Sequence, residues 1–226
     1  MGKQRSCILV FMKSPEKGCV KTRLAASIGE MAALQLYKCF VEDTLSMISQ
    51  SGYEFNICYY PKHAERGMAE WLGYNHIFWP QEGKDLGERM ANAFIRAFAK
   101  GCDKALLMGT DIPDLPVSVI DKAFDRLKNK DAVIGPALDG GYYLIGFNSD
   151  SFISKPFENI KWSTKTVFEN TVKILETEKA GVHILPQWRD IDRYDDLMAL
   201  MNSAFQNGFD TSRTYKYLSD RKSIFL

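Results

Sequence analysis

A basic loop follows the first apolar run of the chain. Within eleven residues it carries Lys13, Lys17, Lys21 and Arg23, and Gly18 gives its backbone extra freedom. Backbone N–H groups and side-chain cations that converge on one point suit the oxygens of a polyphosphate. The loop has neither a Walker-type phosphate motif nor a dinucleotide-binding glycine motif. It predicts a phosphate site of another kind, with a solvated basic loop as the alternative.

Asp111 stands just after a second apolar run, residues 105–108. A carboxylate at the end of a strand can hold a hard divalent cation such as Mg²⁺, which takes its other ligands from water and phosphate. Asp192 offers a second carboxylate, since it stands where another strand gives way to the last predicted helix. The alternatives are that Asp111 caps a turn and that Asp192 is the N-cap of that helix.

Between two further apolar runs lies the sequence Asp139, Gly140 and Gly141. Two glycines let a ligand approach the backbone closely, and the connection from residue 136 to 140 is longer than a tight turn needs. We therefore interpret it as part of a sugar or acceptor subsite. A plain hairpin turn is the alternative.

Trp162, Ser163 and Thr164 precede a run with helical periodicity. Because a helix N-terminus favours negative charge, we expect these residues to open a helix that faces the same crevice and helps to hold the acceptor. Simple helix capping is the alternative.

Three polar residues follow the third predicted strand. Gln81, Asp85 and Arg89 lie beside its end and could contact the base, the ribose or the acceptor. Helix capping by Asp85 and ordinary surface charge are the alternatives for this group.

Apolar runs and helical patterns alternate along the chain. This alternation predicts an α/β fold in which these loops connect strands and helices. Strands are predicted at 7–12, 55–60, 76–79, 105–108, 132–134, 142–147 and 182–185. Helices are predicted from a capping box at Ser27–Glu30 to Gly52 and at 64–72, 86–99, 117–127, 164–179 and 192–205, while the tail shows no clear period. Such alternation predicts a three-layer α/β/α sandwich with a mostly parallel sheet. Loops that leave parallel strands emerge at the same edge, where ligands bind.

Length and composition limit the class of protein. The chain has 226 residues, of which 46% are hydrophobic and 25% charged, and it is expected to form one globular domain over 1–226. This composition excludes a disordered chain. The net charge of +1 gives no overall field for nucleic acid or an anionic membrane, so neither is expected as a partner. The sequence does not indicate an oligomeric state.

Cysteine and histidine usage limits the metal and redox chemistry. The five cysteines contain no CxxC pair and lie in or beside apolar runs, which is typical of reduced thiols in a cytoplasmic protein. The three histidines are too far apart in sequence for a zinc motif. The first apolar run is too short for a signal-peptide core or a membrane span.

Taken together and in this order, the loops resemble the GT-A-like nucleotide-diphospho-sugar transferase superfamily. They are most similar to bacterial transferases often found near radical-SAM and selenium-associated genes, and distantly similar to the guanylyltransferases that activate phospholactate or molybdopterin. The resemblance covers roughly residues 8–200. Its matching pieces are 13–24, 81–90, Gly109-Thr110-Asp111 with Pro113, 135–142, 162–164, and Asp190-Ile191-Asp192 with Asp196-Leu197.

The resemblance implies a seven-stranded mixed sheet, a nucleotide over its N-terminal half, and Mg²⁺ or Mn²⁺ held by Asp111 and Asp192. The chain departs from sugar transferases that carry two aspartates at one strand end, because Thr110-Asp111-Ile112 has only one. It also lacks the full glycine-rich loop of sugar nucleotidyltransferases.

The resulting hypothesis is a metal-dependent transferase that binds a nucleotide or nucleotide sugar and transfers its sugar to a small acceptor. We assign Lys21 and Asp111 catalytic roles, and Lys13, Gly18 and Arg23 to the phosphates. No nucleophile with an adjacent base recurs in these loops, which favours direct displacement. The alternatives are a nucleotidyltransferase that releases pyrophosphate and a non-catalytic nucleotide-binding module.

Overall fold

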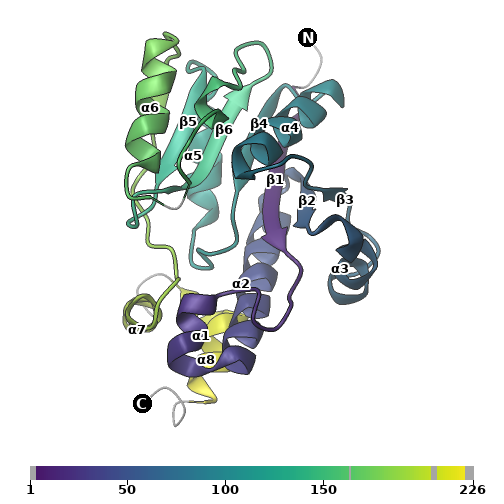
Figure 1. Ribbon diagram of the computed structural model, residues 1–226, viewed down its shortest axis with the longest axis vertical. Helices are drawn as coiled ribbons and strands as arrows, with labels where there is room; N and C mark the ends of the chain where they lie inside the picture. Colours follow the sequence, from purple (N-terminus) through teal and green to yellow (C-terminus); the bar gives the residue numbers. More distant parts are fainter. Residues whose placement is uncertain (1–3, 163, 205–207, 222–226) are drawn as a thin grey trace.

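The computed structural model describes residues 4–162, 164–204 and 208–221. In these ranges the strands form one seven-stranded sheet in the order β3-β2-β1-β4-β6-β5-β7 (Figure 1). Their bounds are β1 Ser6–Lys13, β2 Glu54–Tyr60, β3 Phe78–Pro80, β4 Lys104–Met108, β5 Ala132–Pro136, β6 Tyr142–Asn148 and β7 Val182–Ile184. Only β6 runs antiparallel to its neighbours, β4 and β5. The predicted mixed, mostly parallel sheet is confirmed.

The central strands are apolar throughout because both faces of the sheet are covered. In β1, Ile8 and Val10 pack on one face among residues of α2, α3 and α5, while Cys7 and Leu9 pack on the other among residues of α4 and α6. The bounds of the helices are α1 Thr22–Ile28, α2 Glu30–Ser51, α3 Glu65–Leu72, α4 Leu86–Ala99, α5 Val117–Arg126, α6 Val167–Thr177, α7 Tyr194–Ser203 and α8 Arg213–Ser219. Short 3-10 turns occupy Lys62–Ala64, Lys155–Phe157 and Phe209–Thr211.

A third apolar cluster lies beyond the carboxyl end of β1. It joins α1, one stripe of α2, α7 and α8, which gather at the end of the molecule opposite the N-terminus (Figure 1). Ile191, in the loop before α7, is buried in this cluster. The cluster therefore holds the start of α1 and the loop before α7 close to the end of the sheet.

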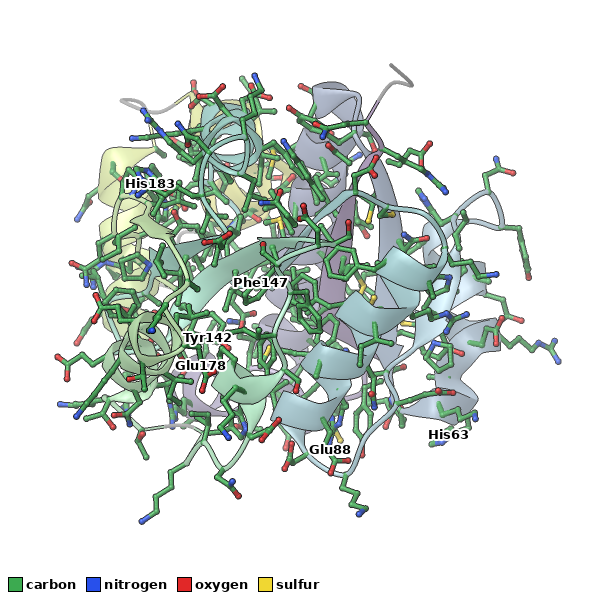
Figure 2. All side chains as sticks on the ribbon, turned by 90° about the horizontal axis from the view of Figure 1, so that it is seen from above. His63, Glu88, Tyr142, Phe147, Glu178 and His183 are labelled. Carbon is green, nitrogen blue, oxygen red and sulfur yellow. The ribbon has the colours of Figure 1, made fainter. Side chains whose placement is uncertain are left out.

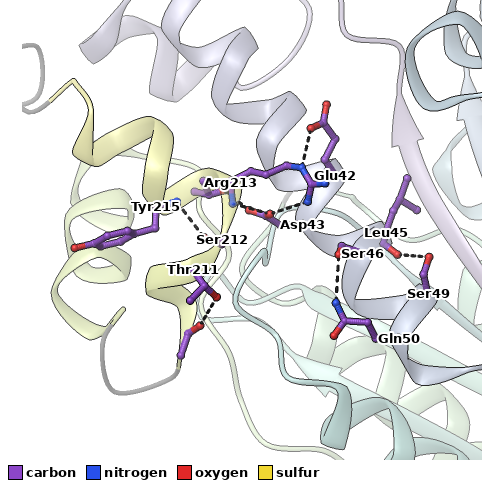
Figure 3. A network of polar contacts seen from close by, with 12 residues as sticks. Glu42, Asp43, Leu45, Ser46, Ser49, Gln50, Thr211, Ser212, Arg213 and Tyr215 are labelled. Atoms are coloured by element: carbon purple, nitrogen blue, oxygen red, sulfur yellow. Dashed lines mark hydrogen bonds and ion pairs between the residues drawn. The ribbon is translucent and has the colours of Figure 1, made fainter.

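Arg213 and Asp43 tie α8 to α2, as Figure 3 shows. Asp43 is buried on α2, and its carboxylate accepts the backbone N–H groups of Arg213 and Thr214, each at 2.9 Å. The Arg213 guanidinium also pairs with Glu42 at 3.4 Å. A buried carboxylate on α2 thus satisfies the first N–H groups of α8.

Two expectations about the N-terminal helices were wrong. The capping box at Ser27–Glu30 does not form, because Ser27 lies inside α1 and α2 begins at Glu30 after Gly29. Gly29 has φ +84°, a conformation that glycine adopts without strain, and it separates two helices where one was expected. The tail, in which the sequence shows no clear period, contains α8.

Two expected helix starts were also wrong. The helix predicted from Thr164 begins at Val167, so Trp162 and Thr164 lie in the loop before α6, and Ser163 lies outside the described residues. The last helix begins at Tyr194, and its N-cap is Arg193 rather than Asp192. Asp196 accepts the Arg193 N–H and fixes this N-cap one residue later than predicted.

Candidate active site

A cavity of about 650 Å³ opens where β1 and β4 end. Many of the predicted site residues line it: Lys13, Lys21, Arg23, Gln81, Arg89, Asp111, Asp139, Gly141, Trp162, Thr164 and Asp192. Gly18, Asp85 and Gly140 do not belong to its lining. Loops from six separate parts of the chain therefore meet at the edge of the sheet where the sequence placed the ligand.

Lys21 is the most deeply anchored cation of the cavity. Its side chain is only 3% exposed, and its ammonium nitrogen lies 2.7 Å from Oδ1 of Asp111. The same ammonium donates to the carbonyl of Ile191 at 2.5 Å and lies 5.5 Å from the ring centre of Phe40. The backbone of Lys21 has φ 49°, in the left-handed region, just before α1 begins. Lys21 thus joins the basic loop, the Asp111 loop and the loop before α7.

Arg23 lies on the first turn of α1 and forms the second ion pair of the site. Its guanidinium is 2.7 Å from Oδ2 of Asp192. The Ile191 N–H donates to the carbonyl of Asp111 at 2.9 Å, so the backbones beside Asp111 and Asp192 are directly linked. The two aspartates predicted to meet therefore face one cavity, each paired with a cation of the basic loop.

The side chains of Tyr37 and Gln81 hydrogen-bond to backbone groups of β1 and β2 beside the cavity. The Tyr37 hydroxyl accepts the Lys13 N–H at 2.8 Å and donates to the Lys13 carbonyl at 2.9 Å. The Gln81 amide donates to the carbonyls of Met12 and Cys58, at 3.3 and 2.8 Å. Tyr37 was not among the predicted site residues, because helical periodicity does not show where a hydroxyl points.

Asp190 also lines the cavity, although it was not among the site residues predicted from the sequence. Burial, followed by the negative charge of Asp139, raises its pKa to about 6. Asp139 and Asp111 both act on it electrostatically, so three carboxylates share one part of the cavity with Asp192 close by. The only sequence signal was its place two residues before Asp192.

Arg89 lies over the ring of Tyr60, with 4.2 Å from the guanidinium carbon to the ring centre. Its Nε is buried and has no hydrogen-bond partner among the described residues. Asp85 accepts the Glu88 N–H at 2.9 Å and is the N-cap of α4. For Asp85, the structure therefore shows the alternative, helix capping. Arg89 does line the cavity, as predicted for a ligand contact.

The opposite wall is formed by the loops before β6 and α6. Gly140 has φ +93°, and a Cβ built there would lie 2.1 Å from the carbonyl oxygen of Lys165, so this close approach requires glycine. The rings of Tyr142 and Trp162 meet edge to face with their centres 6.4 Å apart. The hydroxyl of Thr164 donates to the Lys161 carbonyl. This part of the lining thus combines two aromatic rings with the carboxylate of Asp139.

The cavity offers carboxylate oxygens to the divalent cation that the resemblance implies. Among the described residues, no group of three or more His, Cys, Asp or Glu side chains is arranged to hold a metal ion. Two of the histidines, His63 and His183, lie on opposite sides of the molecule (Figure 2). The carboxylate oxygens of Asp111 and Asp192 fit Mg²⁺ or Mn²⁺, since Mg²⁺ commonly takes one or two carboxylates and completes its shell with phosphate and water. The residues fit a cation shared with a phosphate ligand.

The sheet order, the cavity at the strand ends and the basic loop define a nucleotide-diphospho-sugar transferase fold. A protein of Desulfovibrio desulfuricans G20, described as a "putative nucleotide-diphospho-sugar transferase", is 41% identical, with a TM-score of 0.95 over 99% of this chain and 97% of that one. Residues 44–164 match the family model "Uncharacterized protein conserved in bacteria (DUF2064)". The chain belongs to this family.

More distant structures share the fold alone. The 4-diphosphocytidyl-2C-methyl-D-erythritol synthase of Anaerococcus prevotii is 11% identical, with a TM-score of 0.59 over 90% of this chain and 99% of that one. A cytidylyltransferase of Leptospira borgpetersenii is 14% identical, with a TM-score of 0.57 over 99% and 97%. A search of curated protein sequences finds no significant match. No helix in the described ranges is long and apolar enough to cross a membrane.

Proposed function

We propose that this protein binds a nucleotide sugar in the cavity at the ends of β1 and β4 and transfers the sugar to a small acceptor. The observation that carries the proposal is the pairing of Lys21 with Asp111 and of Arg23 with Asp192, which brings the basic loop and two acidic loops into one cavity. The description of the Desulfovibrio protein, similar over almost its whole length, supports sugar transfer as the reaction.

The basic loop would bind the phosphates. Lys13 and Arg23 line the cavity from the end of β1 and the first turn of α1. Arg23 can hold two phosphate oxygens at once because its guanidinium is a planar fork. Lys21, fixed from below by the Ile191 carbonyl, would set the position of the Asp111 carboxylate.

Asp111 and Asp192 would hold the divalent cation together with the phosphates. When bound, Mg²⁺ or Mn²⁺ would neutralise the charge that grows on the leaving phosphate. The remaining groups orient the substrates. Gln81 and Arg89 border the nucleotide side, and the wall of Asp139, Gly141 and Trp162 borders the sugar or acceptor. Sugar rings pack their apolar face on aromatic side chains, which suits the exposed part of Trp162.

Nucleotidyl transfer is the second candidate. It is supported by the fold shared with the cytidylyltransferases and by two cations of the basic loop, Lys21 and Arg23, that line the cavity. A non-catalytic module that binds nucleotides is the third candidate. All three need the same phosphate contacts, so binding and turnover must be measured separately.

The binding test is a thermal-shift screen of nucleotides and nucleotide sugars with and without Mg²⁺, because a ligand of the native state stabilises it by about 2.7 kcal/mol at a hundred times Kd. Arg23→Ala should weaken binding of the best ligand by about 1.5–3 kcal/mol. The matched control Arg66→Ala breaks an exposed pair on α3 away from the cavity and should leave affinity unchanged. Unchanged affinity in Arg23→Ala would remove the phosphate site.

The turnover test follows the phosphorus products by ³¹P NMR with the ligands found in the screen. A nucleotide sugar and an acceptor that yield a nucleoside diphosphate or monophosphate support sugar transfer. A nucleoside triphosphate that yields pyrophosphate supports nucleotidyl transfer instead. Binding without turnover across the acceptor panel supports the non-catalytic module.

A further inference from the structure

The cations of the two ion pairs in the cavity differ in burial and in the number of their contacts. The Lys21 side chain is almost fully buried, and the Ile191 carbonyl and the Phe40 ring fix its ammonium in addition to Asp111. The Arg23 side chain is 56% exposed, and Asp192 is the side-chain partner of its guanidinium in the described part of the chain. Lys21 is therefore built into the site, while Arg23 can move.

Arg23 also pairs with the carboxylate of Asp192, which in the proposed function binds the divalent cation. Its guanidinium nitrogen lies 2.7 Å from Oδ2 of Asp192, so a metal ion that binds this oxygen must compete with a positive charge already in contact with it. Solvent-exposed ion pairs are weak, so such a contact can be displaced by a stronger partner. A polyphosphate is that partner for an arginine, because it offers several oxygens and more negative charge.

We propose that Arg23 is a displaceable latch on Asp192 that couples phosphate binding to cation binding. A polyphosphate draws the guanidinium away, and the freed Asp192 then accepts the divalent cation beside Asp111. The coupling is reciprocal, since a cation on Asp192 releases Arg23 for the phosphate. The inference rests on the proposed function and concerns how the site is regulated.

Lys21 cannot act in the same way. Its ammonium has three N–H donors, and the Ile191 carbonyl and Asp111 hold it inside the protein. Asp111 is itself half exposed, so a second carboxylate oxygen remains for a cation while Lys21 stays in place. The two aspartates thus have different tasks: Asp111 is permanently positioned, and Asp192 becomes available when phosphate arrives.

The test measures binding of Mn²⁺ alone by isothermal titration, in a buffer without phosphate. The latch predicts that Arg23→Gln binds Mn²⁺ about three- to tenfold more tightly than the wild type, as expected when a competing exposed ion pair and its charge are removed. The matched control Arg189→Gln removes the same charge from a pair with Asp196 in the first turn of α7 and should change Mn²⁺ affinity less than twofold.

A second background separates the latch from a general charge effect. In Asp192→Asn the latch has no partner, so adding Arg23→Gln should no longer tighten Mn²⁺ binding. The reciprocal arm titrates inorganic pyrophosphate in the presence of EDTA, where Asp192→Asn should bind it more tightly than the wild type because Arg23 is free. Urea unfolding of each variant checks that the fold is intact.

The outcomes distinguish the latch from the function it rests on. A wild-type protein that binds Mn²⁺ and pyrophosphate, with no gain in Arg23→Gln or an equal gain in the Asp192→Asn background, overturns the latch and leaves the proposed function standing. A wild-type protein that binds neither Mn²⁺ nor pyrophosphate overturns both. A gain that appears only when Asp192 is intact supports the latch.

Discussion

The ammonium of Lys21 lies 2.7 Å from Oδ1 of Asp111, although the two residues belong to loops that follow different strands. β1 and β4 are neighbouring parallel strands, so these loops leave the sheet at the same edge. The Ile191 carbonyl accepts from the same ammonium and brings the loop before α7 to this point. One buried lysine therefore links the three segments that carry the two ion pairs of the site.

The contact of Asp43 with α8 should contribute strongly to stability. Asp43→Ala would leave the N–H groups of Arg213 and Thr214 without their acceptor, so we expect a loss of about 2 kcal/mol in the free energy of unfolding. Urea denaturation measures it. Gln50→Ala on the same helix removes only a 3.4 Å exposed contact with Ser46 and serves as the control, with a change under about 0.5 kcal/mol. Equal effects of the two changes would show that Asp43 does not hold α8.

Trp162 should report ligand binding at the acceptor wall. A sugar-bearing ligand that packs on its ring should change the tryptophan fluorescence saturably, and Trp162→Leu should abolish this change and weaken binding by about 0.5–1.5 kcal/mol. Trp71 donates to Glu42 away from the cavity, so Trp71→Phe is the matched control. If the signal survives in Trp162→Leu and disappears in Trp71→Phe, the ligand does not lie against this wall.

The raised pKa of Asp190, about 6, makes stability depend on pH. The ordinary carboxyl pKa is about 3.9, so the folded protein binds this proton more tightly than the unfolded chain. The resulting stability is fully present below about pH 4 and is lost as pH rises through about 6. Since Asp190 is partly exposed, we expect the difference between pH 4 and 7 to be about 1–2 kcal/mol.

Asp190→Asn should remove this contribution. With a chelator present, its free energy of unfolding should fall less than that of the wild type between pH 4 and 7. Asp195→Asn, an exposed aspartate in the first turn of α7, should follow the wild type. Parallel pH curves for the wild type and Asp190→Asn would contradict the raised pKa.

The sequence predicted the central part of the fold well, for a physical reason. Strands buried on both faces are continuous apolar runs, and α4, at 86–99, has an apolar stripe that ends near Gly101. The errors lie where a backbone conformation or a tertiary contact determines where a helix begins or whether it forms. Gly29 breaks one expected helix into α1 and α2, and α8 depends on Asp43 for its first N–H groups, which no local period reveals.

The site was predictable in part, because topology brings loops after parallel strands together. The chain order alone placed Lys21, Arg23, Asp111 and Asp192 at one edge, and the structure brings them into one cavity. The partners of each charge were not predictable. The Lys21 contact with the Ile191 carbonyl depends on how α7 packs, and the raised pKa of Asp190 depends on burial and on Asp139.

The most direct measurement of the central claim is the affinity of Asp111→Asn for the best nucleotide ligand with and without Mg²⁺, by isothermal titration. The account predicts that Mg²⁺ strengthens binding to the wild type and to the control Asp195→Asn, and that this metal-dependent gain disappears in Asp111→Asn. The substitution should leave the fold intact, because the half-exposed carboxylate faces the cavity rather than the core. An Asp111→Asn protein that keeps the full metal-dependent gain would contradict a metal site at Asp111 and Asp192.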